Sequence, residues 1–549
     1  MTFSTMQERP LLISGIFEHG RRIYGESRVI TMSPGGRHEA TFAEVGRRTA
    51  ALAHALGKLG VGREDRVGTF CWNDQAHLEA YYAISGMGAV LHTLNIRLFP
   101  DQLSYVVTHA EDKVILINDT LLPLLAKVVH ELDTVQHIVV IGKGDASCLS
   151  AAPNAQLHRY EDLIAMSLDG GDYAWPDLDE RAPAAMAYTS GTTGNPKGVV
   201  YSHRSTYLHA LGLASGATAG LSERDMVLPV VPMFHANAWG IPYAGWLMGC
   251  DFLMPGPLLQ PEPLVNMIQK EKPTFAGAVP SIWTGMLHYC EGKDVDLSSL
   301  RLVLCGGSAV PESLMRGFQE KHGVTIIQAW GMTETSPLGA VSYAPKQATP
   351  DQQWTYRNRT GRVSACVEMR IVADDGSILP WDGSSVGEIQ VRGPWVTASY
   401  YGVEDGVGEP SKFQDGWLRT GDVGYVDERG YCQITDRAKD VIKSGGEWIS
   451  SVELENVIMA HPSVLEAAVV GVPDPKWEER PLACVVPKPG VTLTEQALHE
   501  FLSDKVARFW LPERYAFIAE VPKTSVGKFD KKVLRAQYAD GKLTVITRG

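Results

Sequence analysis

Residues 188–198 (YTSGTTGNPKG) bring together the groups that bind a polyphosphate. Gly191, Gly194 and Gly198 free the backbone to bend toward a ligand. Lys197 adds a positive charge, which favours phosphate oxygens. Hydroxyl groups come from Thr189, Ser190, Thr192 and Thr193. The spacing fits neither GxxxxGK[ST] nor GxGxxG, and we favour phosphate binding over the alternative, a solvated turn rich in Ser and Thr.

Four further polar segments follow along the chain: 328–334 (QAWGMTE), 417–422 (WLRTGD), 436–440 (DRAKD) and 522–528 (PKTSVGK). With residues 188–198 they resemble, in the same order, five motifs of the adenylate-forming superfamily. That superfamily includes acyl-CoA synthetases, luciferases and peptide-synthetase adenylation domains. Its motifs are a phosphate loop, an adenine and magnesium motif, a ribose motif, a hinge and a catalytic-lysine loop. The resemblance covers nearly the whole chain.

The resemblance implies a role for each matching residue. Thr189 and Glu334 would hold Mg²⁺, a hard cation that prefers oxygen ligands. Asp422 would accept hydrogen bonds from the ribose of ATP. Lys528 would bridge the attacking carboxylate and the nucleotide, the alternative being an exposed lysine on a polar loop. The other nucleotide contacts implied are Gly307, Ser308, Gln328, Ala329, Trp330, Gly331, Met332, Thr333 and Arg437.

The hinge motif implies a C-terminal domain that moves between two half-reactions. Lys439 occupies the pivot position, and a second group follows it on the face that would meet coenzyme A. That group consists of Lys443, Gly445, Gly446 and Trp448. Two adjacent glycines let pantetheine pass close to the backbone. Two alternatives stay open: residues 444–446 are a flexible linker, and Lys443 and Trp448 touch the adenylate instead.

Residues 233–239 (MFHANAW) are expected beside the acyl pocket. Amino-acid-activating relatives carry an Asp soon after the Phe, whereas here the positions hold His235, Ala236 and Asn237. A buried ammonium would have no partner, so a neutral acid is expected. By resemblance His235 would orient the carboxylate, the alternative being a buried imidazole. By resemblance to fatty acyl-CoA synthetases Trp239 would gate the tail, the alternative being packing in the core. Small residues expected to leave a slot are Gly277, Ala278 and Gly331.

Composition excludes several classes of protein. The 549 residues carry a net charge of −13 with no block of basic residues, which argues against nucleic acid or an anionic membrane as the main partner. The chain shows neither a signal-peptide pattern nor an apolar run long enough to cross a bilayer, so a cytoplasmic location is expected. Eight Cys residues without a CxxC pair indicate buried thiols; a disulfide framework or a zinc site is the alternative.

Strand and helix patterns alternate along most of the chain. Strands are expected at 112–119, 274–279, 301–307 and 324–330, with helices at 120–132, 281–289 and 311–323. A helix is also expected from the Thr41-x-x-Glu44 capping box to near Gly60. After about residue 385 the pattern becomes antiparallel, with a turn at 428–430, and another helix begins near Ser450.

These patterns predict an α/β protein with helix-covered sheets and an antiparallel β-barrel-like part in the large N-terminal domain, 1–435. A hinge at 436–440 and a small, mobile α+β C-terminal domain, 441–549, would follow. Residues 91–114 and 442–456 resemble fatty acyl-CoA synthetases and relatives that activate 3-methylthiopropionate, a subgroup that is often homodimeric.

The function predicted is an ATP-dependent, AMP-forming acid–CoA ligase. Its substrates would be ATP, coenzyme A and a medium- to long-chain fatty acid, with Mg²⁺ as the metal. One alternative is a ligase for a small or unusual acid such as 3-methylthiopropionate. Others are transfer to a carrier-protein thiol, a luciferase-like oxygenation and a non-catalytic acyl-nucleotide sensor, which would not need Lys528, Glu334 and Asp422 intact.

Overall fold

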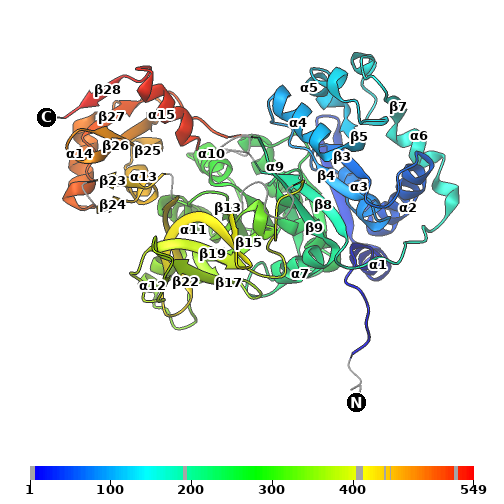
Figure 1. Cartoon of the computed structure of the whole chain (residues 1–549), viewed down its shortest axis with the longest axis horizontal. Helices are drawn as coiled ribbons and strands as arrows, with labels where there is room; N and C mark the ends of the chain where they lie inside the picture. Colours follow the sequence, from blue (N-terminus) through cyan, green and yellow to red (C-terminus); the bar gives the residue numbers. More distant parts are fainter. Residues whose placement is uncertain are drawn as a thin grey trace.

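The computed structural model describes residues 6–189, 195–402, 412–437, 440–444, 447–524 and 529–548. Within these ranges the strands form three sheets. Two belong to the larger, N-terminal part of the chain, and the third lies in the C-terminal part, which Figure 1 draws in orange and red at one end of the molecule.

A 15-stranded sheet carries most of the predicted motifs. Its order is β18-β17-β19-β21-β22-β16-β15-β14-β13-β12-β10-β11-β1-β2, and β20 pairs with β21. The strands are β1 (Arg28–Ser33), β2 (Gly36–Thr41), β10 (Met226–Pro229), β11 (Asp251–Met254), β12 (Phe275–Ala278), β13 (Leu302–Gly306), β14 (Ile326–Gly331), β15 (Leu338–Val341), β16 (Gly361–Val363), β17 (Glu368–Val372), β18 (Ile378–Leu379), β19 (Gly387–Arg392), β20 (Phe413–Gln414), β21 (Trp417–Val426) and β22 (Tyr431–Arg437).

The direction of pairing changes along this sheet. From β1 through β11, β10, β12 and β13 to β14 the neighbours are parallel. From β14 onward, through β15, β16, β22, β21, β19 and β17, they are antiparallel. The part predicted as barrel-like is therefore an antiparallel extension of the large sheet, joined to its parallel half at β14 and β15.

A seven-stranded sheet has the order β7-β6-β5-β3-β4-β8-β9. Its strands are β3 (Arg66–Phe70), β4 (Val90–Thr93), β5 (Asp112–Asn118), β6 (His137–Ile141), β7 (Gln156–Arg159), β8 (Pro183–Tyr188) and β9 (Gly198–Ser202). All neighbours are parallel except the last pair, β8 and β9, which form an antiparallel hairpin.

Helices cover the sheets, as the alternating pattern predicts. They are α1 (Ile13–Ile23), α2 (Phe42–Lys58), α3 (Gln75–Gly86), α4 (Pro100–Ala110), α5 (Leu122–Leu125), α6 (Tyr160–Ala165), α7 (His203–Ala214), α8 (Ile241–Leu247), α9 (Pro261–Glu271), α10 (Pro280–Cys290), α11 (Glu312–His322) and α12 (Pro350–Arg357). The largest apolar core contains buried residues of both sheets and of α2, α3, α7 and α8, so these helices join the two sheets.

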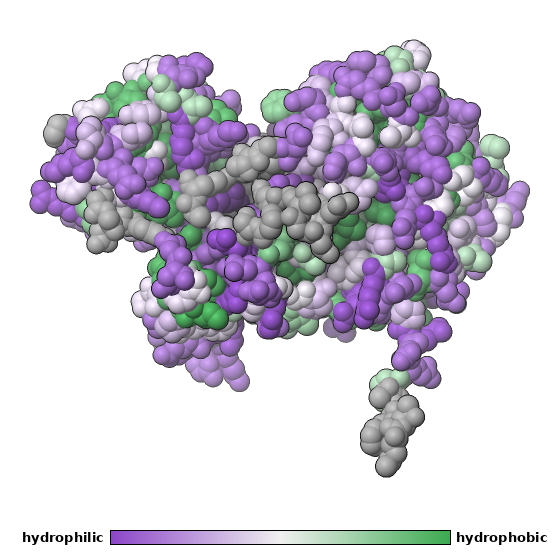
Figure 2. Space-filling model, in the orientation of Figure 1, coloured by the Kyte–Doolittle hydropathy of each residue, from purple (hydrophilic) through white to green (hydrophobic). Residues whose placement is uncertain are grey.

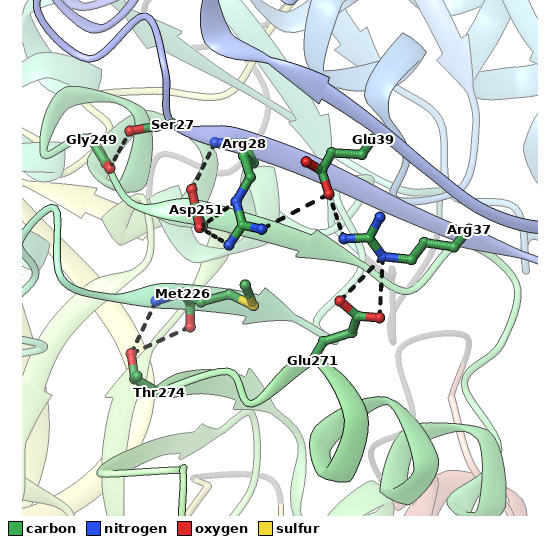
Figure 3. A network of polar contacts seen from close by, with 9 residues as sticks. All are labelled: Ser27, Arg28, Arg37, Glu39, Met226, Gly249, Asp251, Glu271 and Thr274. Carbon is green, nitrogen blue, oxygen red and sulfur yellow. Dashed lines mark hydrogen bonds and ion pairs between the residues drawn. The ribbon is translucent and has the colours of Figure 1, made fainter.

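The N-terminal hairpin β1–β2 closes one edge of the large sheet (Figure 3). The Arg28 backbone amide donates to Asp251 at 2.7 Å, and its guanidinium contacts the same carboxylate at 2.6 Å. On the edge strand, Arg37 pairs with Glu39 and with Glu271 of α9. Charged side chains on an edge strand discourage pairing with a second chain, so this network both anchors the hairpin and protects the edge.

The C-terminal part has its own six-stranded sheet. Its strands are β23 (Ile442–Ser444), β24 (Glu447–Ile449), β25 (Val464–Asp474), β26 (Glu478–Pro487), β27 (Arg514–Phe517) and β28 (Val545–Thr547), with helices α13 (Ser451–Met459), α14 (Glu495–Ser503) and α15 (Lys531–Ala539). Its two apolar clusters consist of residues from this part alone. In the surface view of Figure 2 a notch in the upper outline separates it from the rest.

Most of the predicted elements are present, with their end signals. Thr41 and Glu44 form the capping box that starts α2, and Gly323 ends α11 in a left-handed conformation. The helix predicted over 120–132 is wrong: the chain forms only the four-residue α5 there, flanked by short 3₁₀ turns. Pro123 fits only in a first helical turn, and the β-branched pair Val128 and Val129 disfavours continuation.

The sheet changes across the predicted hinge. β22 of the large sheet ends at Arg437, and β23 of the C-terminal sheet begins at Ile442. That residues 436–440 act as a hinge stays a prediction. Among the described residues, none of the helices combines the length and the apolar character needed to cross a membrane.

Candidate active site

The predicted phosphate loop connects the two strands of the β8–β9 hairpin. The Thr189 amide donates to the Lys197 carbonyl at 2.9 Å, and the Lys197 amide donates to Thr189 Oγ1 at 3.2 Å. These bonds extend the strand pairing by one step, so Thr189 and Lys197 stand together at the neck of the loop. Five residues of the loop lie outside the described ranges, and their role stays a prediction: Ser190, Gly191, Thr192, Thr193 and Gly194.

The adenine and magnesium motif forms the end of β14 and the 3₁₀ turn Thr333–Thr335. Gly331 admits no side chain, because a Cβ there would lie 1.5 Å from the Pro337 carbonyl oxygen. The turn is joined to β9 by the Tyr201 hydroxyl, which donates to the Thr333 carbonyl at 2.9 Å. Burial, reinforced by the charge of Glu334, raises the pKa of Tyr201, so its hydroxyl keeps the proton that it donates.

Glu334 is almost fully buried, with 6% of its surface exposed. Its Oε1 accepts a hydrogen bond from the Tyr400 hydroxyl at 2.7 Å. The ammonium of Lys197 lies 5.2 Å from the centre of the Tyr400 ring. The residues predicted to hold phosphate and metal therefore meet at one tyrosine. Met332 contributes through its backbone, whose amide donates to Thr335 Oγ1 at 3.0 Å.

The predicted adenine wall follows the ends of β13 and β14. Gly307 has a φ of 92°, a conformation that favours glycine, and Ser308 beside it is exposed. Gln328 is buried and accepts from the Val310 amide at 2.6 Å while its own amide group donates to the Arg359 carbonyl at 2.8 Å. The side-chain oxygen and nitrogen of Gln328 are thus both bonded to backbone groups, so Gln328 stabilises this wall.

Trp330 and Asp422 join the adenine motif to the ribose motif across 92 positions of sequence. The Trp330 indole donates to Asp422 Oδ2 at 2.9 Å, and Arg437 Nε lies 3.6 Å from the other carboxylate oxygen. The indole ring packs on Gly339, where a Cβ would lie 2.5 Å from ring carbons. Ala329, the preceding residue, places its carbonyl 2.6 Å from the position of a Gly306 Cβ, so that glycine is required.

The segment predicted to border the acyl pocket adopts a rare backbone conformation. Four consecutive residues other than glycine are left-handed, with φ values of 41, 53, 50 and 56°: Ala236, Asn237, Ala238 and Trp239. For Ala and Trp this conformation costs about 1–2 kcal/mol per residue, so the surrounding packing must hold the turn. His235, at its start, is half-buried, whereas Ala236 is fully buried. Strain of this kind is concentrated at ligand sites.

Trp239 packs over two glycines of the large sheet. Its ring carbons lie 3.6 Å from the position of a Cβ at Gly277 and 3.7 Å from that of one at Gly306. Ala278 is placed differently: its side chain belongs to the core cluster with Trp283, which packs on the other face of β12. The structure thus brings Trp239 and Gly277 together, but it does not bring Ala278 to them.

The predicted coenzyme A face is described only in part. Lys443 is exposed on β23, and its backbone amide donates to Glu479 at 3.0 Å. Trp448 pairs with Lys443 along the strands β23 and β24. Lys439, Gly445, Gly446 and the catalytic Lys528 lie outside the described residues, and so does the side chain of Trp448. Their roles stay predictions.

The residues around Glu334 fit a magnesium ion by their chemistry. Mg²⁺ is commonly held by one or two carboxylates together with substrate phosphates. Glu334 offers a buried carboxylate of which one oxygen is oriented by Tyr400, and Thr189 offers a hydroxyl at the neck of the phosphate loop. An oxygen donor set of this kind suits a hard cation.

Comparison with known proteins gives the same family as the motifs. A family profile described as "AMP-binding enzyme" matches residues 17–401, and one described as "AMP-binding enzyme C-terminal domain" matches residues 453–528. The chain belongs to the AMP-binding enzyme family. The resemblance to the adenylate-forming superfamily is thereby confirmed.

Two curated relatives of this AMP-binding enzyme match over nearly their whole length. The 3-methylmercaptopropionyl-CoA ligase of Ruegeria pomeroyi is 45% identical over 97% of this chain and 98% of its own. The long-chain-fatty-acid–CoA ligase of Thermus thermophilus is 44% identical over 97% of each chain. Among solved structures, the anthranilate CoA ligase AuaEII in complex with anthranoyl-AMP superposes with a TM-score of 0.86 at 26% identity, covering 98% of this chain and 100% of that one. The predicted fold is confirmed.

Two buried side chains of this AMP-binding enzyme were not predicted from the sequence. Asn73 donates to the carbonyls of Pro229 and Val231 at 2.7 and 2.9 Å and accepts from the Met233 amide at 2.7 Å, which fixes the approach to the left-handed turn. The second is Tyr400. Neither lies in one of the five motifs, and no local pattern distinguishes them from ordinary core residues.

Proposed function

We propose that the chain is an ATP-dependent, AMP-forming ligase that joins a neutral aliphatic acid to coenzyme A. In the first half-reaction a carboxylate oxygen bonds to the α-phosphorus of ATP and pyrophosphate leaves, giving an acyl-adenylate. In the second the thiol of coenzyme A attacks the acyl carbon, AMP leaves with the bridging oxygen, and the thiol proton passes to solvent.

One observation supports the proposal most directly: motifs far apart in sequence meet through side-chain contacts. The Trp330–Asp422 bond joins the predicted adenine and ribose positions. The Tyr400 contacts join the neck of the phosphate loop to the predicted metal ligand. An ATP site requires the groups that bind adenine, ribose, phosphate and metal to lie next to one another, and no single motif could supply all four.

The side chains have distinct tasks in this proposal. Transfer of the adenylyl group develops negative charge on the phosphates, so catalysis depends on positioning and on electrostatic stabilisation. Lys197 would neutralise the departing pyrophosphate, and Asp422 would hold the ribose. Glu334 and Thr189 would hold Mg²⁺, which when bound supplies further positive charge at the phosphates. By resemblance, Lys528 would bridge the carboxylate and the nucleotide.

The residues at the acyl pocket support a neutral acid. Where a carboxylate would pair with an amino-acid ammonium, this chain has His235, Ala236 and Asn237. Trp239 and Gly277 give the site an apolar wall. The relative from Thermus thermophilus is named for long-chain fatty acids, and we propose a medium- to long-chain fatty acid as the substrate.

A small thioether acid such as 3-methylmercaptopropionate is the second candidate. The ring of Trp239 packs directly on Gly277 and Gly306, an arrangement that suits a short acyl group. The Ruegeria pomeroyi relative is named for this acid. A longer tail would require Trp239 to move aside, whereas a short thioether acid would not.

Pyrophosphate release with acids from C3 to C18, methylmercaptopropionate and amino acids, each with and without coenzyme A, tests the proposal. Turnover on neutral acids that requires coenzyme A for AMP release supports it, and the best acid distinguishes the two candidates. Activity only with amino acids overturns the substrate class. No pyrophosphate release with any acid favours the nucleotide sensor. A Lys528→Ala variant must lose pyrophosphate release if the lysine acts as proposed.

A hinge at residues 436–440 and a homodimer are also proposed, on the resemblance alone. The cytoplasmic location predicted from the sequence is proposed with them. Light scattering coupled to size-exclusion chromatography tests the dimer.

A further inference from the structure

A short described segment, residues 397–401, connects two parts of the proposed ATP site. The Thr397 amide donates to the backbone carbonyl of Glu334 at 2.8 Å. Four residues later, the Tyr401 amide donates to the Gly198 carbonyl at the start of β9, also at 2.8 Å. The segment is therefore fixed at both ends, one to the turn of the predicted metal ligand and the other to the hairpin of the phosphate loop. Tyr400 lies between these attachments.

The Tyr400 side chain contacts a charged group at each side. It is buried, with 7% of its surface exposed. Its hydroxyl donates to Glu334 Oε1 at 2.7 Å, and Lys197 Nζ lies 5.2 Å from its ring centre, within the range of a cation–π contact. Phe413 holds the ring edge-on, with centroids 5.4 Å apart and planes at 74°.

The hydroxyl of Tyr400 suits the carboxylate of Glu334, and its ring suits the ammonium of Lys197. A hydrogen bond to one carboxylate oxygen fixes the plane of Glu334 and leaves the other oxygen to a metal ion. The electron-rich face of the ring attracts the Lys197 ammonium without neutralising it. A buried phenol between a cation and an anion thus sets their orientation and their separation.

We propose that Tyr400 is a positioning residue that orients the carboxylate of Glu334 for a divalent cation and places Lys197 beside the phosphates. The inference rests on the proposed function, because it assumes that Mg²⁺ and ATP bind here. The charged groups that Tyr400 contacts are the predicted metal ligand and the predicted phosphate ligand, so its effect is expected at the metal and the phosphates.

The test measures nucleotide binding in the absence of acid and coenzyme A, so that no turnover is required. Titration calorimetry gives the dissociation constant of ATP with Mg²⁺ and with EDTA. Tyr400→Phe keeps the ring beneath Lys197 but removes the bond to Glu334, and Tyr400→Leu removes both. Tyr401→Phe is the matched control, because that neighbouring ring faces His109, 5.5 Å away.

We expect Tyr400→Phe to weaken binding of ATP with Mg²⁺ about tenfold or more, the effect of losing a hydrogen bond to a charged group. Without Mg²⁺ its affinity should stay within about twofold of wild type. Tyr400→Leu should weaken both, and Tyr401→Phe neither. Manganese binding followed by electron paramagnetic resonance should show the same order.

Two results would overturn the inference while leaving the proposed function intact. Tyr400→Phe binding ATP with Mg²⁺ as tightly as wild type removes the role at Glu334. An equal loss with and without Mg²⁺ indicates a merely structural residue. A wild-type protein that binds no ATP overturns the proposed function itself, and the inference with it. Thermal unfolding of each variant identifies loss of fold, and Tyr400→Phe, which deletes only one oxygen, keeps the test decisive if Tyr400→Leu unfolds.

Discussion

Replacing Asp422 by Asn tests the proposed ribose contact with the smallest change of shape. One carboxylate oxygen accepts from the Trp330 indole at 2.9 Å, and the other lies 3.6 Å from Arg437 Nε. Only 13% of the side chain is exposed, so water competes little for it. Asn can still accept from Trp330, but it carries no charge. The substitution therefore weakens the ribose hydrogen bonds while it preserves the packing.

The magnitude follows from the difference between charged and neutral hydrogen bonds. A bond to a charged group contributes about 1.5–3 kcal/mol and a neutral one about 0.5–1.5 kcal/mol. Two ribose hydroxyls would then lose roughly 2–3 kcal/mol together, which weakens ATP binding about 30- to 150-fold.

Titration calorimetry with ATP and with 2′,3′-dideoxy-ATP separates this effect from general damage. Wild type should prefer ATP strongly, Asp422→Asn should lose about 30- to 150-fold of that preference while still binding ATP better than dideoxy-ATP, and dideoxy-ATP should bind both proteins alike. If the variant keeps the wild-type preference for ATP, Asp422 does not hold the ribose and our assignment of the nucleotide site is wrong.

Two predictions concern stability. Glu79 is fully buried and pairs with Arg48 at 2.7 Å, so Glu79→Ala should lower the free energy of unfolding by about 3–5 kcal/mol in urea titrations. Glu161, the exposed second partner of Arg48, is the control: Glu161→Ala should cost less than about 1 kcal/mol, and equal losses would contradict the argument from burial. Burial lowers the pKa of His203 to about 4 and that of His209 to about 3, and each ring accepts a hydrogen bond from a backbone amide. Below pH 6.5 the two imidazoles become protonated in the unfolded chain but stay neutral in the native protein. The stability that the neutral imidazoles allow is therefore complete above pH 6.5 and is lost as the pH falls toward 4. His203→Gln should reduce that loss by about 1.4 kcal/mol per pH unit, and identical slopes for the two proteins would refute it.

The sequence predicts best what short-range chemistry determines. The capping box at Thr41 and Glu44 and the glycine stop at Gly323 depend on a few neighbouring residues, and both are present as predicted. The motifs likewise locate Glu334 and Asp422 in the chain. Over 120–132 the apolar pattern predicts a helix, but Pro123 and the β-branched pair Val128 and Val129 interrupt it. The spacing of apolar residues carries no information about these interruptions.

What the sequence misses depends on contacts between distant segments. Nothing local to Tyr400 indicates that its hydroxyl reaches Glu334, 66 positions away. The side of β12 that Ala278 faces depends on strand register, and the run of small residues gives no signal of it. The left-handed turn before Gly240 is equally invisible, since Ala and Trp rarely adopt that conformation and only tertiary packing maintains it.

The fate of the carboxylate oxygens tests the central claim most directly. The protein is incubated with ATP, Mg²⁺, coenzyme A and the best acid of the panel, with both carboxylate oxygens labelled with ¹⁸O, and the AMP is analysed by mass spectrometry. Because an acyl-adenylate keeps the bridging oxygen on the α-phosphorus when the thiol displaces AMP, our account predicts one ¹⁸O in each AMP and one in the acyl-CoA carbonyl. Unlabelled AMP, with the label in inorganic phosphate or pyrophosphate, would contradict it.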